Sequence, residues 1–147
     1  MDTEIYTGFP SRKISDWFQT KNKFERLISD FKPDVILVDR QRHFAQIASN
    51  SLIPLIIHLR GNIWEETKWA RETTYNSFFK KIILQKWTDM ATYTFQKSTL
   101  IIPICKYLEK IVKQHYPDKN TGVISSGIDA SKWYQVKGMK LKHPCVG

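Results

Sequence analysis

Apolar residues recur along the chain with two alternating periods. Residues 14–31 carry apolar side chains at helical intervals before Pro33, whereas the run 34–38 reads DVILV and is short and rich in β-branched residues. The first pattern predicts an amphipathic helix. The second predicts a short strand covered on both faces.

The same alternation continues to the end of the chain. Further short strands are predicted at 4–9, 54–59, 99–104 and 121–125. Helices are predicted at 43–51, at 64–97 with a break near 73–77, and at 107–116. The last helix is expected to bury one stripe, formed by Tyr107, Leu108, Ile111, Val112, His115 and Tyr116. Because parallel strands need crossover connections, this order predicts an α/β fold with a doubly wound, Rossmann-like parallel sheet.

Two segments differ in composition and predict the domain organisation. Residues 1–136 follow the strand and helix pattern and are expected to form one domain. Residues 137–147, KGMKLKHPCVG, are basic and turn-rich and end like the start of another strand. A lone strand needs partners, so we expect this segment to lead into a second domain of a larger protein.

Composition narrows the class of protein. The chain has 147 residues and 41% hydrophobic content, enough for one real core. It has no apolar run long enough to span a bilayer, and its start, MDTEIYTGFP, lacks the charged and apolar parts of a signal peptide. A cytoplasmic location is therefore expected. Cys105 and Cys145 lie far apart without a CxxC pair, which suggests neither a metal site nor a disulfide framework.

Charge points to anionic partners without choosing among them. Lys and Arg number 23 against 14 Asp and Glu, a formal net charge of +9. One alternative is a non-catalytic basic module that binds nucleic acid or a protein partner. The lysines are scattered and no helix-turn-helix, RNP or zinc pattern occurs, so no nucleic-acid partner is predicted.

Polar residues follow the predicted strands and define the candidate site. The carboxyl ends of parallel strands share one edge, where ligands gather in open α/β sheets. We expect the following residues on that rim: Gly8, Asp39, Arg40, His58, Arg60, Gly61, Asn62, Cys105, Lys106, Ser125, Ser126, Gly127 and Asp129.

Arg60 is the sharpest candidate and has two interpretations. It can present a planar donor fork to a phosphate or sugar hydroxyl, with Gly61 permitting close backbone approach. Alternatively, it pairs with Glu65 or Glu66 on the following helix. His58 should point to the same side as Arg60, and a hydrogen-bonded, partly buried histidine is favoured over a catalytic base.

The remaining rim residues are also open to two interpretations. Asp39, Arg40 and His43 follow a buried strand and can orient acceptor hydroxyls, or Asp39 can pair with Arg40 and cap the next helix. Lys106 near a helix start can meet a phosphate or simply be solvated. Gly127 is predicted to supply a turn with positive φ.

The segment 78–87, FFKKIILQKW, combines an apolar face with lysines. The apolar face comprises Phe78, Phe79, Ile82, Ile83 and Trp87, and the lysines are Lys80, Lys81 and Lys86. Such a stripe is usually core. It is also typical of a helix that lies on an anionic membrane.

Three segments in order resemble a known family. Residues 98–133, STLIIPICKYLEKIVKQHYPDKNTGVISSGIDASKW, resemble the end of the N-terminal domain of family 4 glycosyltransferases of the GT-B fold. KPDVILV (32–38) and IPLIIHLRGNIWEE (53–66) are similar to earlier strand regions of that domain. The resemblance covers roughly residues 32 to 135 and rests on the order of the segments more than on any single motif.

The resemblance implies a function. It implies retaining, metal-independent transfer of a hexose from a nucleotide diphosphate sugar to a glycan or lipid acceptor, with no further cofactor. This chain would be the acceptor-side domain, inactive alone, and the main catalytic residues would lie in a C-terminal domain of the same protein. Peripheral membrane contact is a separate expectation, which rests on the apolar and lysine pattern of residues 78–87. The substrate-binding residues implied are Gly8, Asp39, Arg40, His58, Arg60, Gly61, Asn62, Lys106 and Gly127.

Overall fold

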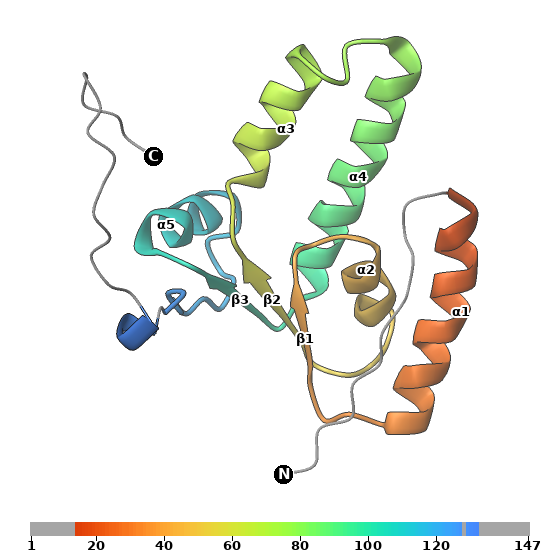
Figure 1. Ribbon diagram of the computed structural model, residues 1–147, viewed down its shortest axis with the longest axis vertical. Coiled ribbons are helices and arrows are strands. Elements are labelled where there is room, and N and C mark those ends of the chain that lie inside the picture. Colours follow the sequence, from red (N-terminus) through yellow and green to blue (C-terminus); the bar gives the residue numbers. More distant parts are fainter. Residues whose placement is uncertain (1–13, 128, 133–147) are drawn as a thin grey trace.

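A three-stranded parallel sheet forms the centre of the computed structural model, which describes residues 14–127 and 129–132. The strands are β1 (Ile36–Asp39), β2 (Leu55–Leu59) and β3 (Leu100–Pro103), in the order β1-β2-β3 (Figure 1). All three were predicted within one or two residues at each end, and the parallel α/β arrangement is confirmed. It is compatible with a Rossmann-like fold.

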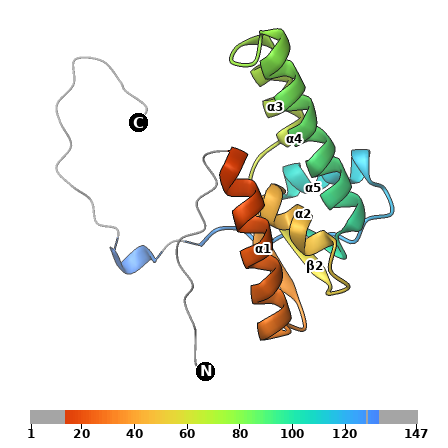
Figure 2. The same cartoon turned by 90° about the vertical axis from the view of Figure 1, so that its right-hand side faces the viewer.

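The helices begin and end close to the predicted positions. They are α1 (Ile14–Phe31), α2 (His43–Ser49), α3 (Ile63–Glu72), α4 (Phe78–Lys97) and α5 (Lys106–His115), with a 3-10 turn at Ala130–Lys132. The predicted break near 73–77 separates α3 from α4. Figures 1 and 2 agree that α1 lies beside α2, and the two helices are in contact.

One face of the sheet holds the core, here called the helix-covered face. Ile57 and Ile101 are fully buried on it, packed against Ala48, Phe95 and Val112 from α2, α4 and α5. Because the strands follow one another in a single direction, right-handed crossovers place these three helices on the same face.

The opposite face is more exposed. Leu37 of β1 exposes 65% of its surface and Val35 exposes 48%, whereas Ile36 and Val38 are buried. The prediction that the strand at 34–38 is covered on both faces is therefore wrong within the described residues. The reason is that only one face of β1 meets the core cluster, which includes Ile36 and Val38 but neither Val35 nor Leu37.

Two predictions near the C-terminus need correction. The segment predicted as a strand at 121–125 forms one parallel bridge, Thr121 with Ile101, and Ile124 N donates to Pro103 O at 3.1 Å, so it runs along β3 without becoming a regular strand. In α5, Leu108 and Val112 are buried, but Tyr107 is 61% exposed and His115 is also exposed. At about 100° per residue, Tyr107 lies well to one side of Leu108 and leaves the buried stripe.

Three sequence predictions fall outside the described residues. They are the strand at 4–9, which contains Gly8, the domain limit at 136, and the segment 137–147. No helix within residues 14–127 and 129–132 has the length and apolarity needed to cross a bilayer.

Candidate functional site

The carboxyl ends of β1 and β2 bring three charged or titratable side chains together. Asp39 ends β1 and lies opposite His58 of β2, and Arg60 follows two residues later. Asp39 Oδ1 is 2.9 Å from Arg60 Nε and 3.4 Å from His58 Nδ1. We call this rim, formed by Asp39, Arg40, His58, Arg60 and the starts of α3 and α5, the carboxyl edge.

Arg60 pairs with Asp39, a pairing that the sequence did not suggest for either residue. Arg60 does not pair with Glu65 or Glu66, and Asp39 does not pair with Arg40, in the described structure. The parallel register is the cause, because it places the Asp39 carboxylate one strand away from Arg60 and on the same side. The ion pair thus joins two strands.

Arg60 retains donors after this pairing. Its side chain is 55% exposed, and Asp39 engages Nε. Within the described residues, no hydrogen bond or ion pair occupies its two terminal Nη groups. A guanidinium fixed through Nε presents these groups as a fork that suits a phosphate or a pair of hydroxyls.

His58 has one unsatisfied nitrogen. Its side chain is 20% exposed, and Nε2 is buried without a hydrogen-bond partner in the described part of the chain. Buried polar nitrogens normally have a partner. The partly buried histidine was predicted, but the carboxylate beside Nδ1 and the unsatisfied Nε2 were not.

The backbone at the end of β1 is strained. Arg40 has φ = 84°, in the left-handed region that residues other than glycine rarely adopt. Its N–H donates to His58 O at 3.2 Å, which ties the turn to β2. Strain of this kind persists only where the surroundings hold it, and it clusters at functional sites.

Gly61 and Asn62 act mainly on α3. Asn62 is its N-cap, and its Oδ1 accepts from Glu65 N at 3.3 Å. The Glu66 carboxylate lies over Gly61 where a Cβ would stand. Gly61 therefore does permit a close approach, and the group that approaches in this structure is Glu66.

The last two candidates, Lys106 and Gly127, follow the carboxyl ends of β3 and of the segment beside it, but they add little to the site. Lys106 is exposed at the first position of α5, as expected for either of its interpretations. Gly127 follows the segment that runs parallel to β3, yet its φ is outside the left-handed region and the space around it is open. The predicted positive-φ turn at Gly127 is therefore wrong. Asp129, expected to cap residues 130–133, does accept from Ser131 N at 3.2 Å.

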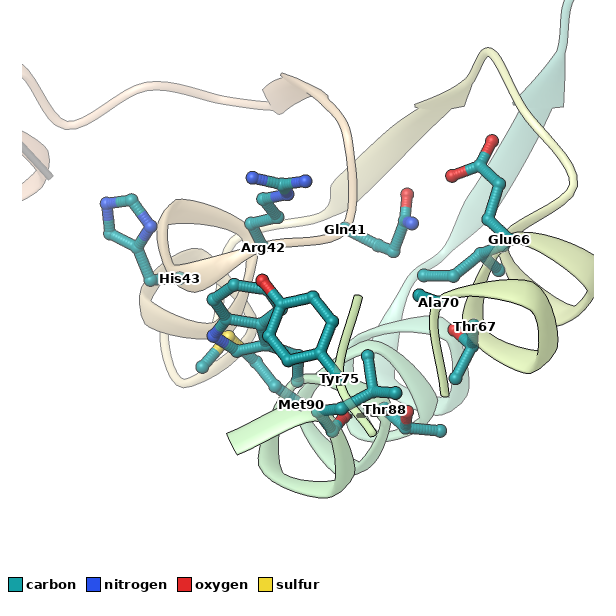
Figure 3. A pocket seen from close by; sticks show the side chains of 12 residues that line it. Gln41, Arg42, His43, Glu66, Thr67, Ala70, Tyr75, Thr88 and Met90 are labelled. Atoms are coloured by element: carbon teal, nitrogen blue, oxygen red, sulfur yellow. Dashed lines mark hydrogen bonds between the residues drawn. The ribbon is translucent and has the colours of Figure 1, made fainter. Parts of the chain in front are cut away.

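A hollow of about 290 Å³ opens beside the carboxyl edge (Figure 3). It lies between the loop after β1, α3 and α4. Figure 3 shows Gln41, Arg42 and Glu66 bordering it. The full lining is Gln41, Arg42, His43, Ile63, Glu66, Thr67, Ala70, Tyr75, Leu84, Trp87, Thr88 and Met90.

Aromatic and cationic groups shape this hollow. The Arg42 guanidinium carbon is 5.7 Å from the centre of the Trp87 ring, and Tyr75 meets the same ring edge-on at 5.5 Å. Burial, with a smaller contribution from the charge of Arg42, lowers the pKa of His43 below its ordinary value. An aromatic wall with hydroxyl, amide and carboxylate groups around it can bind a polar ring such as a sugar.

Most residues of this hollow were not singled out from the sequence. Of its polar lining residues, only His43 was considered for acceptor binding, and Trp87 was assigned to the apolar face of 78–87. The available signal was the pair Gln41 and Arg42 directly after a strand end. Their aromatic neighbours come from more than thirty residues away in the chain, so spacing alone could not find them.

The comparisons with known proteins do not identify a family: no protein-family model and no curated protein matches the chain. Within the described residues, no group of three or more His, Cys, Asp or Glu side chains is arranged to hold a metal ion.

Proposed function

We propose that this chain is the acceptor-side domain of a retaining glycosyltransferase that moves a hexose from a nucleotide diphosphate sugar to a glycan or lipid acceptor. The observation that carries the proposal is the Asp39–Arg60 pair, which fixes a guanidinium at the carboxyl edge while leaving its Nη groups available. Departure of a nucleoside diphosphate develops negative charge, and a preorganised cation stabilises that charge without reorganising.

The hollow beside the edge supports a role in acceptor binding. Arg42 and Tyr75 pack on the Trp87 ring and form an aromatic wall with it, and Gln41, Glu66 and Thr67 offer hydrogen-bonding groups along the border of the hollow. Its volume of about 290 Å³ is near the lower end of small-ligand sites and suits one sugar ring better than a whole nucleotide sugar. In this proposal the hollow holds the acceptor and a second domain holds the donor.

The exposed sheet face supports the larger architecture. Parallel sheets bury both faces in known folds. Leu37 and Val35 leave the second face exposed within the described residues, and an apolar groove of about 680 Å³ runs between α1 and β1. The proposal therefore includes a doubly wound, Rossmann-like GT-B domain in which further chain covers this face. We also propose a cytoplasmic location for the protein.

Two experiments test the function. Purified protein containing this chain and its expected second domain is assayed for transfer from labelled UDP- and GDP-hexoses to lipid and glycan acceptors. Transfer is expected with retained anomeric configuration, and its absence with every donor and acceptor pair contradicts the proposal. The 147-residue chain alone is expected to bind these donors only weakly in calorimetry. Micromolar binding to it would mean that the donor site has been assigned to the wrong domain.

A further inference from the structure

The α3–α4 hairpin carries an apolar surface that the fold does not bury. The hairpin projects away from the sheet on the side of the carboxyl edge (Figure 1). At the start of α4, Phe78 and Phe79 are 73% and 78% exposed, and Ile82 and Ile83 are 43% and 39% exposed. We call residues 68–86 the hairpin tip. The interpretation of 78–87 as a core stripe is therefore wrong for these four side chains.

α4 has two apolar sides, which explains the error. Leu84, Ala91 and Phe95 are buried and face the core. At about 100° per residue, Phe78 and Ile82 point away from the side that carries Leu84. Helical periodicity detects both stripes but cannot tell which one meets the sheet. Trp87, grouped with the exposed stripe in the sequence, turns instead to the hollow beside the carboxyl edge.

The charges around this surface have one dominant sign. The hairpin tip holds one acid, Glu72, and five cations: Lys68, Arg71, Lys80, Lys81 and Lys86. Arg71 bonds to the neutral Gln85 amide and Lys80 to Thr74 O. Among the described residues, none of the five is paired with a carboxylate.

These observations favour one occupant over the others. Two copies meeting through the same surface would face each other with like charges, which opposes a symmetric dimer. A nucleic acid would match the charge but would leave the Phe and Ile side chains without an apolar partner. An anionic bilayer satisfies both, since the acyl region takes up the apolar side chains and the headgroups attract the lysines.

We propose that the hairpin tip docks the protein on an anionic lipid surface, with Phe78, Phe79, Ile82 and Ile83 entering the bilayer and the surrounding cations contacting headgroup phosphates. α3 begins at the carboxyl edge and rises about 15 Å over its length. The docked hairpin therefore leaves the carboxyl edge within about one α3 length of the membrane. The docking uses a surface separate from Arg60, so it stands or fails independently of sugar transfer.

Co-sedimentation of the 147-residue chain with vesicles tests the proposal. Phosphatidylcholine vesicles with and without phosphatidylglycerol are compared at low and high salt. Binding is expected only with phosphatidylglycerol and is expected to weaken in salt. The double variant Phe78→Ser/Phe79→Ser should lose at least tenfold in vesicle partitioning. Lys80→Gln/Lys81→Gln should lose roughly thirtyfold, the value for two surface lysines at about 1 kcal/mol each.

A matched control removes an exposed apolar side chain elsewhere. Leu52 lies in the loop before β2 and is fully exposed, so Leu52→Ser should partition like the original chain. Circular dichroism and the urea midpoint check that each variant folds. The proposal is overturned if the original chain ignores anionic vesicles or if the phenylalanine variant binds as well as Leu52→Ser. It is also overturned if light scattering shows a dimer that the phenylalanine variant dissociates.

Discussion

The helix-covered face of the sheet consists of buried apolar side chains, whereas its carboxyl edge carries exposed charged ones. On the face, Ile57 and Ile101 are fully buried against alanines and Phe95. At the edge, the Asp39 and Arg60 side chains are 49% and 55% exposed and held by an ion pair. The buried face therefore supplies most of the stability, whereas the edge can carry polar groups at little cost to folding.

The largest effect expected from this comparison is at the centre of the face. Phe95 is 1% exposed and stacks near Trp64. Phe95→Ala should lower the free energy of unfolding by about 3–5 kcal/mol, because it removes a large buried ring and leaves a cavity. Urea denaturation followed by circular dichroism measures it. Phe79→Ala, at an exposed ring on the same helix, should change stability little. Equal losses for the two variants would show that the buried face does not supply most of the stability.

A smaller effect is expected where the edge supports a helix. Asn62 caps α3 through the Glu65 N–H, so Asn62→Ala should cost about 1 kcal/mol of unfolding free energy. Ser77 is the matched control, since it occupies the N-cap of α4 without a side-chain capping bond. Ser77→Ala should cost much less in the same urea measurement. A larger loss at Ser77 than at Asn62 would contradict this capping assignment.

The smallest expected effect is a pH dependence of the unfolding free energy, caused by His43 at the start of α2. The pKa of His43 is lowered from 6.5, so between the lowered pKa and 6.5 the unfolded state binds more protons than the folded state. Stability from neutral His43 is therefore complete above about pH 6.5 and decreases as the pH falls through that window. His43→Gln should flatten this slope in urea midpoints measured from pH 5 to 8.

A second variant sharpens the pH test. Arg42 contributes to the lowered pKa of His43 through its charge, after burial. Arg42→Gln should therefore reduce the slope without removing it. An unchanged slope in His43→Gln would show that another group causes the pH dependence.

Local patterns predicted the elements, because helical and strand periodicity depend on neighbouring residues. The break between α3 and α4 and the burial of Val112 followed from them. The Asp39–Arg60 pair did not, since it depends on the register of two strands twenty residues apart. The exposure of Phe78 and Phe79 could not be predicted either, because an apolar stripe in the sequence does not reveal what it packs against.

A double-mutant cycle measures whether Asp39 acts in sugar transfer by positioning Arg60. In the transferase assay, Arg60→Ala should reduce kcat/KM roughly a hundredfold, about 2.7 kcal/mol, while unfolding changes by at most about 1 kcal/mol. Asp39→Ala should reduce kcat/KM less, because it loosens the guanidinium without removing it. The double variant should be no worse than Arg60→Ala alone. Arg60→Ala with unchanged kcat/KM, or fully additive losses in the cycle, would contradict the account.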